Sequence, residues 1–223
     1  VAWGLLWDRR KRWADVHPDA RGQGIGAWLL RWSAWRAKQL GADRVGQSID
    51  DRRTGVAAWL SASGYTPRYT SWVLGIAAED LPHSAGPARP EEYDVVLGLI
   101  EQAFSEHDDR HPVDLPRWRA MTVERDGFAP EDLLVIREDT TPVAAAFLID
   151  ADEIWVDKLA VAASARGRGY ARDLLAAARS RAAGRGYDRV RLSTDSNTSA
   201  LEVYTRLGMT VERSYTHWAV DLG

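Results

Sequence analysis

The feature that most constrains the fold of this chain is an internal repeat with a spacing near 145 residues. Four short matches occur in the same order along the chain: RGQGIG at 21–26 and RGRGYA at 166–171, DRV at 43–45 and 188–190, GYT at 64–66 and GMT at 208–210, YTSW at 69–72 and YTHW at 215–218. Self-similarity at a fixed offset is typical of duplicated structural units. A chain of 223 residues has room for one large or two small domains. The sequence therefore predicts two copies of one unit.

The two copies differ in length ahead of the glycine-rich loop. The segment 79–90 has three prolines and little periodicity, so we expect it to be a linker. The second copy, residues 91–223, has about 75 residues before its loop and is predicted to be a complete domain. The first copy, residues 1–78, has only 20 residues there, so we expect a partial, degenerate domain that lacks its opening third. Val1 then looks like a cut inside a domain.

Composition excludes several classes of protein. The net charge is −3, which gives no strong field for nucleic acid or an anionic membrane. No apolar run reaches the ~18 residues that a membrane span needs. Cysteine is absent, which rules out disulfides, thiolate metal sites and a cysteine nucleophile. We expect a cytoplasmic protein without a nucleic-acid or membrane partner.

The second copy alternates between helical and strand patterns. Helices are predicted at 91–107, 115–125, 170–183 and 199–207, and strands at 133–137, 143–149, 154–161, 190–193 and 209–220. A turn around residues 139–142 joins the first two strands as a hairpin, whereas later strands follow helices. The sequence therefore predicts an α/β fold with a mixed, α+β type of sheet.

The second glycine-rich loop, residues 166–171, joins a strand to the start of a helix. Glycine lets the backbone approach a ligand closely, and the free N–H groups at a helix start attract anions. Arg166 and Arg168 add positive charge, so a phosphate or pyrophosphate is the natural ligand. The loop lacks the Gly-Lys-Ser/Thr of a P-loop and the third glycine of a dinucleotide fingerprint. Taken alone, it could equally be a plain strand–helix turn.

A second group of residues begins about 30 residues after this loop, and consists of Asn197, Ala200 and Tyr204 ahead of Gly208. Their spacing predicts that Asn197, Ala200 and Tyr204 share one helix face. A small Ala200 would let a ligand lie close, with the Tyr204 hydroxyl on the same face. The alternative for Tyr204 is an aromatic residue packed into the core.

Together the two groups resemble the GNAT superfamily of acyl-CoA-dependent acyltransferases. The matching residues are Arg-x-x-Gly-x-Ala after the strand at 156–161, then Asn-x-x-Ala-x-x-x-Tyr-x-x-x-Gly-Met. The resemblance covers roughly residues 91–220, and the first copy resembles the later two thirds of the same domain. It implies the GNAT fold in a tandem arrangement, and acetyl transfer from acetyl-CoA to an amine of a small molecule or peptide.

The resemblance also implies where acetyl-CoA binds. Its pyrophosphate would lie on the N–H groups of residues 168–171, and its pantetheine arm would pair like an added strand with the backbone near Leu159 and Val161. A backbone N–H around 159–161 would hold the oxyanion, and Tyr204 would protonate the departing thiolate. The cofactor-binding residues expected on this basis are Leu159, Val161, Arg166, Gly167, Arg168, Gly169, Tyr170, Ala171, Asn197, Ala200 and Tyr204.

The general base is less constrained by the sequence. Strand alternation predicts that Glu153, Trp155 and Asp157 lie on one side. The position that relatives use falls close to Trp155, which cannot accept a proton, so Asp157 and Glu153 are the candidates beside the general acid. Both could instead be structural or solvated carboxylates, and an acceptor that arrives neutral needs no base. Trp155 could line the acceptor pocket.

The first copy keeps Arg21, Gly24 and Gly26 in its loop, but Leu60 stands at the position of Tyr204 and has no proton to donate. We therefore expect a structural or regulatory half. The alternative for the whole chain is a non-catalytic CoA-binding or dimerisation module.

Tryptophan is concentrated in the first copy, which has eight of the eleven in the chain. Trp28, Trp32 and Trp35 have helical spacing, which is typical of a packing surface. A homodimer through this half is possible on that basis.

His107, Asp108, Asp109 and His111 have the residue types of a metal site. They lie at the end of a predicted helix before a proline, and no distant partner is evident in the sequence, so a solvated helix end is expected and no metal is predicted. A role at the acceptor entrance is the alternative.

Overall fold

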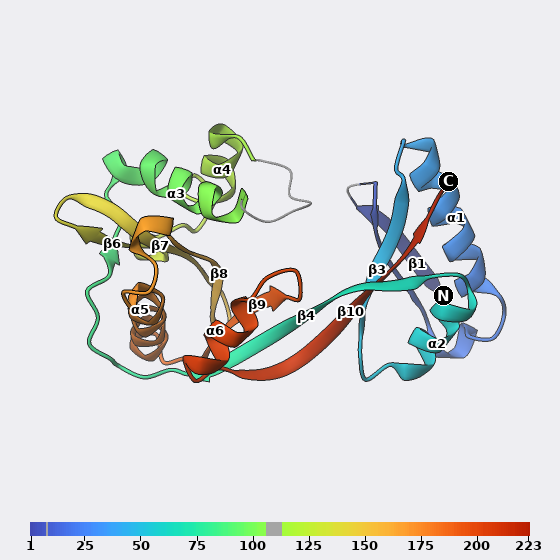
Figure 1. Cartoon of the computed structure of the whole chain (residues 1–223). Helices are drawn as coiled ribbons and strands as arrows, with labels where there is room; N and C mark the ends of the chain where they lie inside the picture. Colours follow the sequence, from blue (N-terminus) through green and yellow to red (C-terminus); the bar gives the residue numbers. More distant parts are fainter. Residues whose placement is uncertain (8, 106–112) are drawn as a thin grey trace. The chain divides into compact units, whose positions relative to one another are not determined.

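The structure of the chain is a computed structural model, which describes residues 1–7, 9–105 and 113–223 (Figure 1). It contains two compact units: unit 1 consists of Val1–Ser71 and Arg213–Gly223, and unit 2 of Trp72–Glu212. Residues 107, 108, 109 and 111, the possible metal or acceptor-entrance group, lie outside the described residues. None of the described helices is long and apolar enough to cross a membrane.

Unit 2 is built on a mixed sheet with helices on both faces. Its own strands are β5 (Gly86–Pro87), β6 (Leu133–Glu138), β7 (Thr141–Asp150), β8 (Ile154–Val161) and β9 (Arg189–Asp195), and its helices are α3 (Tyr93–Ser105), α4 (Leu115–Met121), α5 (Tyr170–Gly184) and α6 (Ala200–Arg206). Strands β5 to β8 pair antiparallel, and β8 pairs parallel with β9. Helices α3 and α4 lie on one face of the sheet and α5 on the other (Figure 1). This architecture confirms the predicted α/β class with a mixed sheet.

Strand β8 contributes side chains to the cores on both faces of the sheet. Ile154 and Val156 belong to the core beneath α5, whereas Ala160 belongs to the core beneath α3. The regular alternation is interrupted between them, because Phe147 of β7 pairs with Lys158 and the next residue pairs with Val156. Asp157 is thus the extra residue of a β-bulge, a feature that redirects neighbouring side chains.

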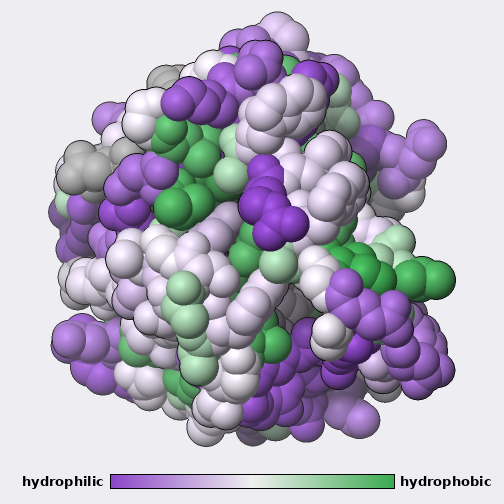
Figure 2. Space-filling model, turned by 90° about the vertical axis from the view of Figure 1, so that its right-hand side faces the viewer, coloured by the Kyte–Doolittle hydropathy of each residue, from purple (hydrophilic) through white to green (hydrophobic). Residues whose placement is uncertain are grey.

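Unit 1 has a smaller sheet with helices α1 (Ile25–Gln39) and α2 (Thr54–Ala62). Strands β1 (Ala2–Trp7) and β2 (Lys11–Val16) are antiparallel, and β2 is parallel to β3 (Arg44–Asp50). Its core centres on Leu30, Leu60 and Tyr65. Hydrophilic and apolar side chains are interspersed on the side shown in Figure 2. Among the large apolar side chains left exposed are Trp28 and Trp35 of α1, at 56% and 58%.

Two long strands belong to both units (Figure 1). Strand β4 (Thr66–Ala77) begins in unit 1 and ends in unit 2, and strand β10 (Thr210–Asp221) does the reverse. In unit 1 β10 pairs antiparallel with β3 over Tyr215–Asp221, and in unit 2 β4 lies beside β9. The prediction of two consecutive domains, 1–78 and 91–223, did not include this exchange of final strands.

Three segments differ in detail from the sequence prediction. The segment 79–90, expected to be a linker, contains β5, which pairs with β6, so it belongs to the sheet of unit 2. Helix α4 ends at Met121 because Thr122 leaves the helical region, with φ −123° and ψ −88°. Helix α6 begins at Ala200.

Candidate functional site

The glycine-rich loop of unit 2 leaves the start of α5 open to a ligand. Gly167 and Gly169 have φ of 78° and 88°, in the left-handed region that favours glycine. Gly169 is the N-cap of α5, and no side chain among the described residues caps it. The first N–H groups of a helix have no partner within the helix. The loop thus offers uncapped donors where the helix dipole is positive, as an anion site requires.

Arg168 and Tyr170, on either side of Gly169, are bound by a carboxylate that the sequence motif did not indicate. Glu138, the last residue of β6, accepts hydrogen bonds on Oε1 from Arg168 Nη1 at 2.8 Å and from the Tyr170 hydroxyl at 2.7 Å. The hydrogen bond from Tyr170 and the charge of Arg168 lower the pKa of Glu138 below its ordinary value. The same hydrogen bond raises the pKa of Tyr170.

The Arg166 side chain turns back toward the strand that precedes the loop. Its Nε donates to the Val161 carbonyl at 3.4 Å. Arg21 makes the equivalent bond in unit 1, from Nε to the Val16 carbonyl at 3.2 Å. Both arginines therefore close the turn between strand and loop, and this role was absent from the sequence prediction.

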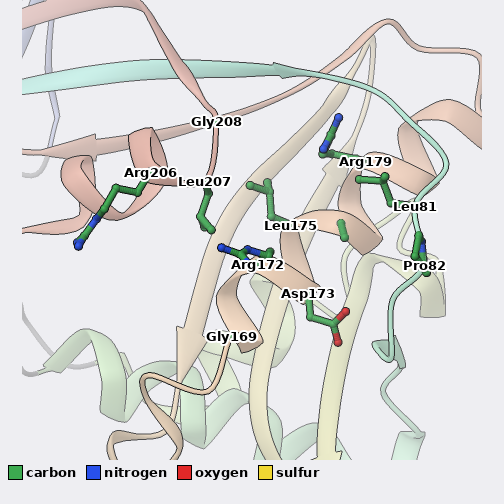
Figure 3. Close-up of a pocket in the computed structure, with 11 residues that line it drawn as sticks. Leu81, Pro82, Gly169, Arg172, Asp173, Leu175, Arg179, Arg206, Leu207 and Gly208 are labelled. Atoms are coloured by element: carbon green, nitrogen blue, oxygen red, sulfur yellow. The ribbon is translucent and has the colours of Figure 1, made fainter.

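A cavity of about 630 Å³ opens beside the start of α5 (Figure 3). Its lining residues come from α5, the end of α6 and the segment before β5: Leu81, Pro82, Gly169, Arg172, Asp173, Leu175, Ala176, Arg179, Arg206, Leu207 and Gly208. Arg172 extends from α5 toward Leu207 (Figure 3). The Asp173 carboxylate accepts from the Ser84 N–H, which fastens the segment before β5 to the helix. Gly169 lines this cavity and is also the N-cap of α5, so the cavity and the glycine-rich loop are contiguous.

Strands β8 and β9 separate next to the loop. Their pairing covers Ile154 to Val156 on β8, and in the described part of the chain β9 has no pairing with β8 beyond Val156. Leu159 and Val161 lie past this point, half-buried against the core beneath α5. An unpaired strand edge of this kind can accept an extended ligand as an added strand.

Tyr204 lies on α6, half-buried against the core beneath α5. Burial raises the pKa of Tyr204 to about 12, so its hydroxyl stays protonated at neutral pH. Ala200 is the first residue of the same helix. Asn197 lies before α6, in a turn where its N–H donates to Asp195 Oδ1 at 2.9 Å. The prediction that Asn197 shares the helix face of Tyr204 was therefore wrong, because α6 starts three residues later.

The two carboxylates considered as general base have different surroundings. Asp157, in the bulge of β8, pairs through Oδ2 with Lys158 Nζ at 2.7 Å. The Lys158 ammonium lies 5.7 Å and 6.0 Å from the ring centres of Phe104 and Trp118. Glu153 precedes β8 and is ion-paired with Arg191 of β9.

Arg191 links Glu153 to a further carboxylate across the sheet. Arg191 Nε binds Glu212 Oε2 at 2.6 Å, and Glu212 Oε1 also accepts from Arg189 at 2.5 Å. The Glu212 side chain crosses β4 at Gly75, where an added Cβ would come within 2.2 Å of Oε1. Gly75 is required for this close approach, and Glu153 is the outer member of a structural ion-pair network.

Several proteins of known family or structure are similar to this chain. The profile of the acetyltransferase (GNAT) family matches residues 94–209. A GCN5-related N-acetyltransferase from Sphaerobacter thermophilus is 26% identical, with a TM-score of 0.82, and the match covers 99% of this chain and 76% of that one. No curated protein matches the chain.

Two more distant structures share the fold. A GNAT-family acetyltransferase from Colwellia psychrerythraea is 17% identical with a TM-score of 0.68, over 99% of this chain and 81% of that one. A tandem GNAT protein from the clavulanic acid biosynthesis pathway is 15% identical with a TM-score of 0.67, over 96% and 75% of the two chains.

Proposed function

The chain belongs to the GNAT acetyltransferase family, and from this premise we propose that unit 2 moves the acetyl group of acetyl-CoA to an amine of a small-molecule or peptide acceptor. The observation that carries the proposal is the start of α5 at Gly169, which no described side chain caps, beside the part of β8 past Val156, where no pairing with the described β9 occurs. The family uses acetyl-CoA as its cosubstrate. The helix start suits its pyrophosphate, and the neighbouring strand edge suits its pantetheine arm.

Each part of acetyl-CoA has a place in this proposal. The loop N–H groups of residues 168–171 bind the pyrophosphate, and the backbone near Leu159 and Val161 pairs with the pantetheine arm. The cavity behind Gly169 takes the adenosine end, because Arg172 lines it and no carboxylate among the described residues forms an ion pair with that side chain. The Arg166 side chain supports the loop through the Val161 carbonyl rather than contacting the ligand.

Tyr204 is proposed as the general acid. A phenol with a pKa of about 12 keeps its proton until the thiolate leaves. A thiolate with a solution pKa near ~8.5 leaves readily and needs only modest help. Tyr204 therefore accelerates the departure of CoA without being indispensable.

Asp157 is the stronger candidate for the general base. Its side chain is 34% exposed and lies in the bulge where β8 and β9 separate, so an incoming amine can reach it. Glu153 is the second candidate, because Arg191 holds its carboxylate in a network that includes Glu212, whereas Asp157 pairs with the neighbouring Lys158. Trp155, on the same strand, is then proposed to line the acceptor pocket.

Unit 1 is proposed to be a second, degenerate copy of the same domain. Helices α1 and α5 each have 15 residues and each begin after a glycine with positive φ. Leu60 and Tyr204 occupy equivalent positions near the ends of their helices. The Leu60 carbonyl accepts from the Tyr65 N–H at 3.0 Å, and the Tyr204 carbonyl accepts from the Met209 N–H at 3.0 Å. Leu60 is fully buried and has no hydroxyl, so unit 1 supports unit 2 rather than catalysing. A homodimer through the exposed tryptophans of unit 1 is a further proposal, which sedimentation at micromolar concentration tests.

Titration calorimetry with acetyl-CoA, followed by thiol release against an amine panel, tests the function. We expect binding, and transfer to at least one amine. Absence of acetyl-CoA binding contradicts the proposal. Binding without transfer to any amine, together with a Tyr204→Phe variant that behaves like wild type, would favour a non-catalytic CoA-binding module instead.

A further inference from the structure

Glu138 is a charged residue at the glycine-rich loop that the proposed function leaves without a role. Its carboxylate binds Arg168 and Tyr170, the two neighbours of Gly169. An acidic side chain is thus fastened to the place where the proposed function puts an anionic pyrophosphate. The inference below rests on that function.

The loop of unit 1 shows that this carboxylate is not needed to build the turn. Gly22 and Gly24 have φ of 75° and 80°, close to the values of the two loop glycines in unit 2. Gln23 stands at the position of Arg168 and binds the Asp19 carbonyl at 3.4 Å. Ile25, at the position of Tyr170, has no hydroxyl to donate. Among the described residues of unit 1, the same backbone therefore forms without an acid that bridges the two neighbours of the N-cap glycine.

In unit 2 Arg168 also binds the backbone carbonyl equivalent to that of Asp19, at Ser164. The contact to Glu138 is added to this shared bond. The contact to Glu138 therefore lies where a ligand would meet Arg168, and the shared turn forms without it in unit 1.

The pair is weak enough for a ligand to break. The side chains of Arg168 and Glu138 are 55% and 38% exposed, and exposed ion pairs contribute little to stability. A pyrophosphate carries more charge than one carboxylate, and arginine binds both groups through the same fork of N–H donors. Tyr170 and Arg168 keep the pKa of Glu138 low, so its negative charge is present at neutral pH.

We propose that Glu138 competes with the pyrophosphate of acetyl-CoA for the Arg168 side chain. In the free protein Glu138 holds Arg168, and on binding Arg168 moves to the phosphates and leaves Glu138 with Tyr170 alone. Glu138 therefore weakens the binding of acetyl-CoA and of the product CoA to the same extent. It is a positioning residue that favours release of the product, and it touches no reacting atom.

Glu138→Gln tests the competition, because the amide oxygen still accepts from Tyr170 while the charge is removed. We expect calorimetry to give acetyl-CoA and CoA dissociation constants about threefold lower than wild type, the size set by weak exposed ion pairs. S-acetylpantetheine, which has no pyrophosphate, should bind the wild-type protein and Glu138→Gln with the same affinity. Glu131→Gln makes the same change of net charge at an exposed site away from the loop and should leave all three affinities unchanged.

Unchanged or weaker acetyl-CoA binding by Glu138→Gln overturns the competition while leaving the proposed function intact. An equal gain in affinity for S-acetylpantetheine also overturns it, since the effect would not involve the pyrophosphate. If the wild-type protein binds no acetyl-CoA, the proposed function fails first, and the inference fails with it.

Discussion

The glycine-rich loops of the two units have one backbone and two different surroundings. Both have paired glycines with positive φ, and both have an arginine that binds the carbonyl at the end of the preceding strand. In unit 2 the loop meets Glu138 and lines a cavity, and the following elements place Tyr204 on α6. In unit 1 Gln23, Ile25 and Leu60 stand at the positions of Arg168, Tyr170 and Tyr204. The glycine motif thus specifies a turn, while its neighbours decide what the turn can bind.

The units also differ in how they bury charge. In unit 2 Asp132 is 1% exposed and binds Arg181 at 2.6 Å, with Arg125 at 3.7 Å. In unit 1 Arg12 is 1% exposed, and its hydrogen-bond partners among the described residues are the neutral groups of Ser33, Gln47 and Tyr65. Burial lowers the pKa of Arg12 from its ordinary value. Unit 2 is stabilised by paired charges, and unit 1 tolerates a buried cation held by neutral oxygens.

The largest expected effect comes from breaking the paired charges. Asp132→Ala removes a carboxylate from Arg125 and Arg181, and Arg181 keeps Asp150 at 3.3 Å, so we expect a loss near the lower end of the about 3–5 kcal/mol of unfolding free energy that breaking a buried pair costs. Urea unfolding followed by tryptophan fluorescence measures the loss. Arg12→Met is the matched change in unit 1 and should stay within about 1 kcal/mol of wild type, because an apolar side chain of similar length replaces an ion whose partners among the described residues are neutral. Equal losses in the two variants would contradict the contrast between the units.

The loops themselves give the next effect. Gly169→Glu puts a side chain and a negative charge at the proposed pyrophosphate site, so we expect acetyl-CoA affinity to fall at least about 100-fold, or ~2.7 kcal/mol. Gly24→Glu imposes the same positive-φ strain in unit 1, where no acetyl-CoA is proposed to bind. Calorimetry should find its affinity near that of wild type. Loss of binding in the Gly24 variant would mean that unit 1 holds the ligand too.

Much of the fold was predictable because it depends on local patterns. Amphipathic spacing indicated α3 and α5, and β-rich runs around a turn indicated the β6–β7 hairpin. The exchange of β4 and β10 was not predictable, since the apolar pattern of a strand records that one face is buried but not in which unit the strand is buried. The repeat itself favours two consecutive domains, because each copy has its own final strand in the sequence.

The site was predictable to the extent that its residues are adjacent in sequence. The loop glycines and Tyr204 form short patterns in the sequence, and the resemblance to the GNAT superfamily implied their proposed roles. Glu138 could not, because it reaches the loop from a hairpin 30 residues earlier. The bulge at Asp157 also left no signal in the sequence, although it interrupts the alternation on which the grouping of Glu153 with Asp157 depended.

Tyr204 gives a smaller effect than the loop. Tyr204→Phe keeps the ring that packs against the core and removes only the proton donor. We expect kcat to fall about tenfold, equivalent to ~1.4 kcal/mol, with little change in acetyl-CoA affinity. Leu60→Tyr restores the phenol in unit 1 and should not rescue that variant, because the proposed chemistry lies in unit 2. Full activity of Tyr204→Phe would contradict the role of Tyr204 as general acid. Leu60 in unit 1 would then no longer indicate a loss of catalysis.

The smallest effect concerns the pH response of unit 1. His217 of β10 stacks on Tyr69 at 4.8 Å between ring centres, and burial with Lys11, Arg44 and Arg68 nearby lowers the pKa of His217 to about 4. Between pH 6.5, the ordinary His value, and about 4, the unfolded chain binds this proton and the folded chain does not. The contribution of His217 to the unfolding free energy is therefore fully present above that window and is lost as the pH drops through it.

Because His217 is only half-buried, we expect about 1 kcal/mol of this loss to depend on it. Urea unfolding at several pH values should show that the unfolding free energy of His217→Gln falls less steeply with decreasing pH than that of the wild-type protein. An unchanged slope in the His217 variant would assign the acid response to other groups.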